Sequence, residues 1–313
     1  MRALVTGGNG FVGRHLIEEL RNRGYETVVA GHGAAFGDGS CDVAIDLRES
    51  GKLLPLLESA RPRVVFHLAA QAFVPRATED PLETYDVNVM GTARLVDAIR
   101  ALPEGAKPRL LFASSAEVYG PHEFSELPLR ETTLAKPATP YAASKLAGEA
   151  IVLSSARTYG FEAIVTRAFN HIGPGQSERF SVPRFARHLA AIALGGSPIL
   201  PVGNLETKRD FLDVRDVVRA YIDLSERGTP GEIYNVCSGV GTRMAEVLRQ
   251  LVMTAHVPVE IREDPALMRP ADVSNVYGDN AKLKAATSWE PTYSLARSLR
   301  DIYEDARSGI GVA

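Results

Sequence analysis

R-A-L-V-T-G-G-N-G-F-V-G, residues 2–13, is the stretch that decides the fold. Residues 3–5 have the length and composition of a buried parallel strand, and glycines at 7, 10 and 13 follow it. Apolar side chains then recur at helical spacing over 11–23, so the stretch predicts a strand, a glycine turn and a helix. Such glycines permit a tight turn, close backbone approach to a pyrophosphate, and close packing of helix on strand. The stretch therefore predicts a dinucleotide site, although glycine loops also occur as plain turns.

Composition narrows the class of protein. The chain has 313 residues, 45% hydrophobic and 23% charged, with a formal net charge of −3. This suits either one large α/β domain with an appended lobe or two domains. Without a basic run or an apolar run near the roughly 18 residues that span a bilayer, we expect no nucleic acid and no membrane partner. A strand opening at residue 2 leaves no room for a signal peptide, so we expect a cytoplasmic protein. Cys41 and Cys237 are too few for a disulfide framework, and we expect no metal site.

The second expected strand, 27–30, bears on the choice of cofactor. In NAD-specific proteins such a strand ends in a carboxylate that holds the adenosine ribose, and none is present here. Its absence removes repulsion against a 2′-phosphate, which favours NADP. No arginine stands at the matching position, so His32 or Arg14 would have to bind that phosphate. NADP is preferred, and NAD stays possible.

The next two strands supply further candidate cofactor contacts. The expected strand 43–45 ends in Asp46 and Leu47, where the carboxylate either accepts the adenine amino group or caps the next helix. The expected strand 64–68 leads into Ala69 and Ala70, whose small side chains let the backbone lie close to a cofactor.

A long helix is expected over 82–102, with Asn88 on its buried face. A buried amide is costly unless it is hydrogen-bonded, so Asn88 is expected to tie neighbouring strand ends together.

Candidate catalytic groups follow the fifth expected strand, 109–113. Ser114 and Ser115 stand at its carboxyl end, where open α/β sheets bind ligands. Tyr141 and Lys145 come next, four residues apart on one face of an expected helix. A free phenol has a pKa near ~10, and a neighbouring ammonium favours the phenolate, so this tyrosine is expected to exchange a proton at neutral pH.

Together these motifs resemble the extended short-chain dehydrogenase/reductase family. The resemblance is carried by Thr6-Gly7-x-x-Gly10-x-x-Gly13, Asp46-Leu47, His67-Leu68-Ala69-Ala70, Asn88-Val89-x-Gly91-Thr92, Ser114-Ser115-x-Glu117-Val118-Tyr119-Gly120 and Tyr141-x-x-x-Lys145. It implies that Ser115 and Tyr141 contact the sugar oxygen that gains or loses hydride. It also implies that Lys145 binds the nicotinamide ribose and depresses the Tyr141 pKa. The implied cofactor contacts are Gly7, Gly10, Phe11, Val12, Gly13, His32, Asp46, Leu47, Leu68, Ala69, Ala70, Asn88, Ala113, Tyr141, Lys145 and Phe169.

The C-terminal half is similar to GDP-4-keto-6-deoxy-D-mannose reductases and the related GDP-mannose 4,6-dehydratases. The segments 165–175, 202–211, 234–239 and 268–272 carry that similarity and imply substrate contacts at Asn170, Arg184, Asn204, Arg209 and Arg269. Isolated guanidinium groups suit a sugar-nucleotide diphosphate. The alternative is surface ion pairing, of Arg209 with Asp210 or Asp213 and of Arg269 with Asp272. His171 is interpreted as a loop histidine satisfied by backbone.

The expected architecture is a Rossmann-type, doubly wound parallel sheet with a smaller C-terminal α/β substrate lobe. Residues 1–170 and a return segment at about 210–240 are expected to form the NAD(P)-binding domain. Residues 171–209 and 241–313 are expected to form the nucleotide-sugar lobe. The family often pairs helices near Asn88 and after Tyr141, so a homodimer is expected, although the small residues there also suit packing within one subunit.

The expected reaction is reduction of a nucleotide-linked 4-keto-6-deoxyhexose, GDP-4-keto-6-deoxy-D-mannose to GDP-D-rhamnose. Hydride comes from NAD(P)H, Tyr141 gives the proton, and Ser115 hydrogen-bonds the developing alkoxide. Glu117 keeps a GDP-mannose 4,6-dehydratase open, whereas Ala116 stands where the dTDP-glucose type has an aspartate. A nucleotide-sugar 4-epimerase is weakened by the missing carboxylate after Ala30. A non-catalytic dinucleotide sensor is disfavoured because Ser115, Tyr141 and Lys145 are all present.

Overall fold

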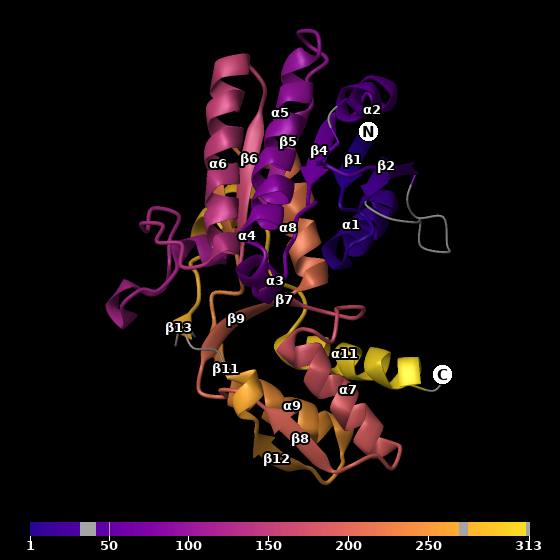
Figure 1. The fold of residues 1–313 in the computed structure, drawn as a ribbon, viewed down its shortest axis with the longest axis vertical. Helices are drawn as coiled ribbons and strands as arrows, with labels where there is room; N and C mark the ends of the chain where they lie inside the picture. Colours follow the sequence, from indigo (N-terminus) through magenta and orange to yellow (C-terminus); the bar gives the residue numbers. More distant parts are fainter. Residues whose placement is uncertain (32–41, 50, 269–274, 311–313) are drawn as a thin grey trace.

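A seven-stranded, wholly parallel sheet forms the upper part of the computed structural model, which describes residues 1–31, 42–49, 51–268 and 275–310 (Figure 1). The strand order is β10-β6-β5-β4-β1-β2-β3. Its strands are β1 (Arg2–Thr6), β2 (Glu26–Gly31), β3 (Val43–Ala44), β4 (Val64–His67), β5 (Arg109–Ser115), β6 (Ala163–Ala168) and β10 (Ile233–Val236). In the register of the sheet, Val5 lies between Val29 and Phe66. Such near-continuous apolar runs are what a sheet buried on both faces requires.

Helices cover both faces of this sheet. One core cluster joins α1 (Phe11–Asn22) and α8 (Val214–Arg227) to the sheet, and the other joins α2 (Leu53–Ala60), α5 (Gly91–Ala101) and α6 (Pro140–Tyr159) to the opposite face. The strand order reverses direction between β1 and β4, so the chain leaves a crevice at their carboxyl ends. Ligands of doubly wound sheets bind in that crevice. The predicted fold class is confirmed.

A smaller lobe lies at the carboxyl edge of the sheet (Figure 1). In it β9 (Lys208–Asp213) pairs with β7 (Asn170–Ile172), β11 (Gly241–Arg243) and β13 (Asn275–Val276), and β8 (Ile199–Val202) pairs with β12 (Glu260–Glu263). Three helices, α7 (Ser181–Ala193), α9 (Met244–Ala255) and α11 (Leu295–Ile310), pack into its core. The expectation that residues 210–213 return to the main sheet is therefore wrong, because within the described ranges β9 pairs with strands of this lobe and with none of the larger sheet. The return begins with α8.

The C-terminal segment crosses between the two parts. Helix α10 (Ala281–Thr287) packs on α8 and β10, and Leu283 and Trp289 are buried in the core of the nucleotide side. The Trp289 indole donates a hydrogen bond to the carbonyl of Asp216. Residues 281–289 were expected in the substrate lobe, and the structure instead packs them against the larger sheet.

The helix expected over 82–102 is interrupted. The chain forms α3 (Val74–Glu79) and α4 (Pro81–Tyr85), then a π-helical turn (Asp86–Met90), then α5. Asp80 caps α4 by accepting a hydrogen bond from the Glu83 amide at 3.0 Å. A π-turn within a helix often marks a functional site, and this one carries Asn88. Short 3₁₀ turns occupy Ala116–Tyr119, Phe124–Glu126 and Pro265–Leu267. Over the described ranges, no helix has the length and apolar character needed to span a membrane.

Candidate active site

The glycine turn forms an open cradle at the N-terminus of α1. Gly7 has φ of +71°, and a Cβ there would lie 2.7 Å from the Ala69 amide nitrogen. At Gly13 a Cβ would lie 2.4 Å from the Gly7 carbonyl oxygen, so only glycine lets α1 pack this closely. Gly10 caps α1, and a Cβ on it would meet only that same carbonyl. The start of α1 therefore carries no side chain at Gly7, Gly10 or Gly13, which fits the close approach of a dinucleotide pyrophosphate to a helix N-terminus.

Asp46 is engaged within its own turn. Its carboxylate accepts hydrogen bonds from the Arg48 backbone amide at 2.9 Å and pairs with the Arg48 guanidinium at 2.6 Å. The N-cap of the next helix, α2, is Lys52. The helix-cap alternative is therefore wrong, and the adenine contact stays a prediction. Leu47 is buried against Gly91 at the start of α5.

Ser115 and Tyr141 meet at the carboxyl edge of the sheet. Ser115 ends β5 and its hydroxyl accepts a hydrogen bond from the Glu117 amide at 3.1 Å. Tyr141 lies in the first turn of α6, which Thr139 caps through the Ala142 amide at 3.1 Å. The Tyr141 phenol is buried, and the Ser115 side chain lies close enough to lower its pKa. The structure thus brings together the predicted pair of hydroxyl groups.

The Tyr141 phenol is held in its neutral form. Burial raises its pKa above the ordinary value of 10, the Ser115 side chain opposes the rise, and the Glu117 carboxylate adds to it. The expected depression of this pKa by Lys145 is therefore wrong for the protein alone. The physical reason is that desolvation of a buried phenolate outweighs the stabilisation available to it. A neutral phenol is a proton donor, which is the state a reduction needs.

Lys145, one helical turn after Tyr141 on α6, is held by the strand that ends in Ser115. Its ammonium donates to the Ala113 carbonyl at 2.8 Å and lies 5.2 Å from the centre of the Phe112 ring. Burial lowers the Lys145 pKa to about 8, while the Glu149 carboxylate acts in the opposite direction. The lysine is therefore mainly charged at neutral pH and positioned by a backbone carbonyl of β5.

A buried ion pair supports the same region. The Glu149 carboxylate accepts from Arg167 through two nitrogens, at 2.9 and 2.7 Å, and from the Ser114 hydroxyl at 2.5 Å. The Arg167 guanidinium also stacks over Tyr119, 4.8 Å from the ring centre. Ser114 is thus a structural partner of α6, whereas Ser115 reaches the site.

Asn88 links two segments of the nucleotide side. Its amide oxygen accepts from the Gln71 backbone amide at 2.7 Å, and its amide nitrogen donates to the Gln71 carbonyl at 3.0 Å and the Ser144 hydroxyl at 2.9 Å. The expectation that Asn88 joins two strand ends is correct for one of its partners, the segment after β4, and wrong for the other, which is a helix. It joins the segment after β4 to α6, because the π-turn places the residue beside that helix.

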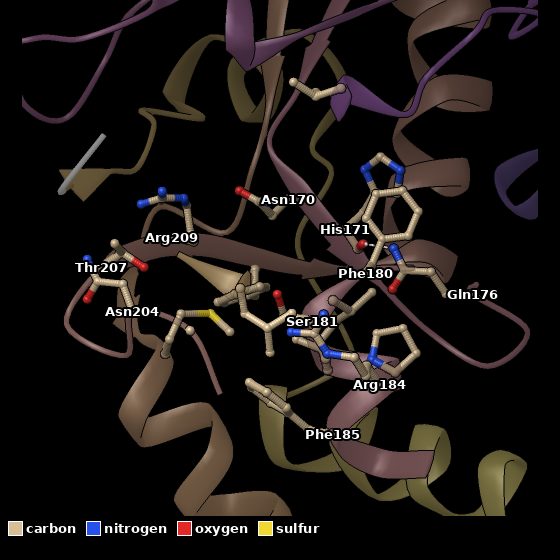
Figure 2. A pocket seen from close by; sticks show the side chains of 18 of the residues that line it. Asn170, His171, Gln176, Phe180, Ser181, Arg184, Phe185, Asn204, Thr207 and Arg209 are labelled. Atoms are coloured by element: carbon tan, nitrogen blue, oxygen red, sulfur yellow. Dashed lines mark hydrogen bonds between the residues drawn. The ribbon is translucent and has the colours of Figure 1, made fainter. Parts of the chain in front are cut away.

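A pocket lies between the larger sheet, represented by residues 73–75 and Glu117, and the smaller lobe. It is lined by four of the five predicted substrate residues, Asn170, Arg184, Asn204 and Arg209, and by Glu117. Figure 2 shows Asn170 and Arg209 on one wall, with Arg184 and Phe185 of α7 across from them. Of the four predicted catalytic residues, Glu117 lines this pocket, beside basic and amide side chains of the smaller lobe, whereas Ser115, Tyr141 and Lys145 are not part of its lining.

The carboxylates suggested as partners of Arg209 are engaged elsewhere. Asp210 accepts hydrogen bonds from the Ser238 hydroxyl and amide, both at 2.7 Å, and Asp213 pairs with Arg215 at 2.7 Å. The Arg209 guanidinium donates to the Lys208 carbonyl at 2.8 Å and lines the pocket. This arrangement favours the substrate interpretation of Arg209 over surface pairing with these two aspartates.

The remaining predicted residues divide into three groups. Phe11, Val12, Leu68, Ala69, Ala70 and Ala113 lie around the glycine turn and the neighbouring strand ends. The Phe169 side chain is buried in a cluster with Tyr119 and Cys237, so a cofactor contact there would fall to its backbone. His32, Arg269 and Asp272 lie outside the described residues. Within the described ranges, no group of three or more His, Cys, Asp or Glu side chains is arranged to hold a metal ion.

Several pocket residues were not predicted. Gln176, Phe180, Ser181 and Thr207 line the pocket with His171, and the Gln176 amide donates to the His171 carbonyl at 3.0 Å (Figure 2). Helix α7, which brings in Ser181, has a proline in its first turn, a start signal available in the sequence. The His171 imidazole bonds the Phe169 carbonyl at 3.1 Å, which confirms its interpretation as a loop histidine satisfied by backbone.

Comparison with known proteins agrees with this geometry. Residues 4–302 match the family model described as GDP-mannose 4,6 dehydratase. The chain belongs to this family. It is 38% identical over 310 residues to the GDP-6-deoxy-D-mannose reductase of Pseudomonas aeruginosa, covering 99% of this chain and 98% of that protein. It is 30% identical to the GDP-6-deoxy-D-talose 4-dehydrogenase of Aggregatibacter actinomycetemcomitans, covering 97% and 98%.

The fold comparison points to the same group. The structure of RMD from Pseudomonas aeruginosa, solved in complex with NADPH, is similar with a TM-score of 0.87 and 38% identity. The similarity covers 98% of this chain and 99% of that one. The predicted family resemblance is confirmed over essentially the whole chain.

Proposed function

We propose that this protein reduces a nucleotide-linked 4-keto-6-deoxyhexose, converting GDP-4-keto-6-deoxy-D-mannose to GDP-D-rhamnose. The cofactor is NADPH, with NADH as the alternative, and when bound it supplies the hydride. The proposal is carried by the neutral Tyr141 phenol beside Ser115, in a chain 38% identical to a GDP-6-deoxy-D-mannose reductase. The cradle around Gly10 is open to a dinucleotide, which supports the cofactor assignment.

Each residue has one task in this proposal. Tyr141 gives its phenolic proton to the C4 oxygen as that oxygen gains negative charge, and Ser115 hydrogen-bonds the same oxygen. Lys145, held on the Ala113 carbonyl, orients the nicotinamide ribose. Arg209 and Asn170 bind the diphosphate from the pocket wall. The product is an alcohol that carries one hydride from the cofactor and one proton from the tyrosine.

A dehydratase is the second candidate because Glu117 lines the pocket and its charge acts on Tyr141. A carboxylate in that position is suited to remove a proton next to a keto group. Ala116 carries no acid and is buried.

The deciding experiment mixes the purified protein, NADPH or NADH, and freshly generated GDP-4-keto-6-deoxy-D-mannose while the absorbance of the reduced nicotinamide is followed. Stoichiometric loss of the signal is expected, and the two cofactors compared directly show which is preferred. Chromatography of the product against GDP-D-rhamnose and GDP-6-deoxy-D-talose fixes the configuration at C4. A second incubation replaces the keto sugar with GDP-mannose. Its conversion to a keto sugar, with no loss of reduced-nicotinamide absorbance in either incubation, would instead make this a dehydratase.

Two variants test the roles of the residues. Tyr141→Phe should lose more than about a hundredfold in turnover while keeping NADPH affinity, since it lacks only the proton donor. Glu117→Gln should keep reduction within about tenfold of the unmodified protein, whereas a dehydratase would lose its activity in that variant. A Tyr141→Phe protein that turns over within about tenfold of the unmodified one would refute the assignment.

A cytoplasmic homodimer is part of the same proposal. The dimer has support in Leu82 and Met90, which are 77% and 48% exposed on the helical segment around Asn88. Analytical ultracentrifugation tests it.

A further inference from the structure

A series of buried polar side chains joins the glycine turn to the catalytic helix without touching the pocket. It runs through Thr6, His67, Thr92, Asn88 and Ser144, each at most 2% exposed. We call these five residues the buried hydrogen-bond path. The members come from β1, β4, α5, the π-turn and α6. Asn88 and Thr92 are four residues apart on one helical segment, and the others are far apart in sequence and meet only in the fold.

The direction of each hydrogen bond in the path is fixed. The Thr92 hydroxyl has one proton and lies 2.6 Å from the backbone carbonyl oxygen of Asn88, which can only accept it. Thr92 must therefore accept from the His67 Nε2–H at 3.1 Å. Because burial lowers the His67 pKa to about 3, aided by the charge of Lys145, the imidazole is neutral and its Nδ1 accepts from the Thr6 hydroxyl at 2.7 Å.

Both ends of the path reach the site. At one end, Thr6 precedes Gly7 and its hydroxyl accepts from the Ala69 amide at 3.4 Å, in the segment that faces the cofactor cradle. At the other end, the Asn88 amide donates to the Ser144 hydroxyl at 2.9 Å, and Ser144 donates to the Tyr141 carbonyl at 2.7 Å. Every hydroxyl in the path donates once and accepts once, so a break at one member leaves its buried neighbours unsatisfied.

The packing around His67 leaves little room for another arrangement. Its ring lies 5.8 Å from the Phe112 ring, which also faces Lys145 at 5.2 Å. A protonated imidazole would place a second positive charge beside Lys145. It would also carry a proton on Nδ1, which could then no longer accept the hydrogen bond from the Thr6 hydroxyl. The neutral Nε2–H tautomer is the only form that satisfies all the partners.

We propose that His67 and Thr92 are positioning residues, which align the cofactor cradle with Tyr141 through the buried hydrogen-bond path. The inference rests on the proposed function only in that a dinucleotide binds the cradle. Cofactor binding at Gly7 and Ala69 is thereby coupled to the position of the first turn of α6. Neither residue touches substrate.

The test compares two substitutions of Thr92 with a matched control. Thr92→Val keeps the shape but removes the hydroxyl, and Thr92→Ser keeps the hydroxyl. Thr287→Val is the control because Thr287, also buried, donates to the carbonyl four residues earlier at 2.8 Å and accepts one N–H at 3.2 Å, from Trp289. Thr287 lies in α10, outside the path.

Three measurements separate positioning from simple destabilisation. In Thr92→Val, kcat should fall about tenfold with an unchanged KM for the sugar nucleotide, because Tyr141 is misaligned while the pocket is intact. NADPH-induced protection of the 140–148 amides from hydrogen exchange should also be lost. Thr92→Ser should retain kcat and the NADPH-induced protection within about twofold of the unmodified protein. Thr287→Val should retain both of these quantities even if its melting temperature falls. Imidazole ¹⁵N NMR of the unmodified protein should show His67 as the neutral Nε2–H tautomer from pH 5 to 9.

The outcomes distinguish this inference from the proposed function. NADPH protection and the His67 tautomer do not depend on which sugar is reduced, so they stand if the substrate assignment fails. Equal protection in Thr92→Val and Thr92→Ser, or an Nδ1–H tautomer of His67, would overturn the inference while leaving the reductase assignment intact.

Discussion

Gly7→Ala is the substitution for which the structure gives the clearest magnitude. At φ of +71° an alanine pays about 1 kcal/mol for the left-handed conformation. Its Cβ would also lie 2.7 Å from the Ala69 nitrogen and 2.8 Å from the Ala69 Cα, which forces a backbone shift that costs about 1–3 kcal/mol. The free energy of unfolding should therefore fall by about 2–4 kcal/mol. For 313 residues the entropy of unfolding is about 0.66 kcal/mol/K, so the melting temperature should fall by about 3–6 °C.

Gly24→Ala is the matched control. Gly24 has φ of +78° but no heavy atom within 4 Å of the position of a Cβ, so only the conformational cost of about 1 kcal/mol applies. Differential scanning calorimetry measures both variants, and titration with NADPH measures their affinity. Gly7→Ala should weaken NADPH binding by at least about tenfold because Ala69 is displaced from the cradle, whereas Gly24→Ala should bind normally. Equal melting temperatures and equal NADPH affinities in the two variants would refute the reasoning.

Three further predictions concern charged groups of the site. Because burial lowers the Lys145 pKa to about 8, the ammonium loses its proton as the pH rises through 8. NADPH affinity should therefore be level below that pH and fall above it, and titrations of Lys145→Met should lack this transition. Glu149→Gln should cost about 3–5 kcal/mol in urea unfolding because it leaves the buried Arg167 charge uncompensated. Glu149→Leu combined with Arg167→Met should cost less, and a single variant as stable as the unmodified protein would contradict this account. Arg209→Lys should raise the KM for the sugar nucleotide about tenfold without changing NADPH affinity, because an ammonium cannot bind a diphosphate bidentately. Steady-state kinetics measures the KM. A rise in the NADPH dissociation constant would instead place Arg209 at the cofactor site.

The sequence by itself determined the nucleotide side of the protein. Glycine spacing over residues 2–13 and apolar runs of strand length are local signals, and they predicted the parallel sheet and the cradle correctly. The pair Tyr141 and Lys145 was also visible, because four residues on one helix fix a shared face whatever the surroundings. Four of the five predicted substrate residues line one pocket, and the family resemblance supplied that prediction, since no local pattern marks them.

Tertiary structure decided what depends on burial and on long-range pairing. The expected phenolate of Tyr141 was wrong because desolvation depends on every element packed around the ring, which a spacing of four residues does not encode. The membership of β9 in the smaller lobe depended on its partners β7 and β11, and strand pairing is non-local. His67 stood in the sequence only as part of a motif. Its role emerged when the fold placed Thr6 and Thr92 on its two ring nitrogens, because hydrogen bonds between residues far apart in the chain exist only once the sheet and helices have packed.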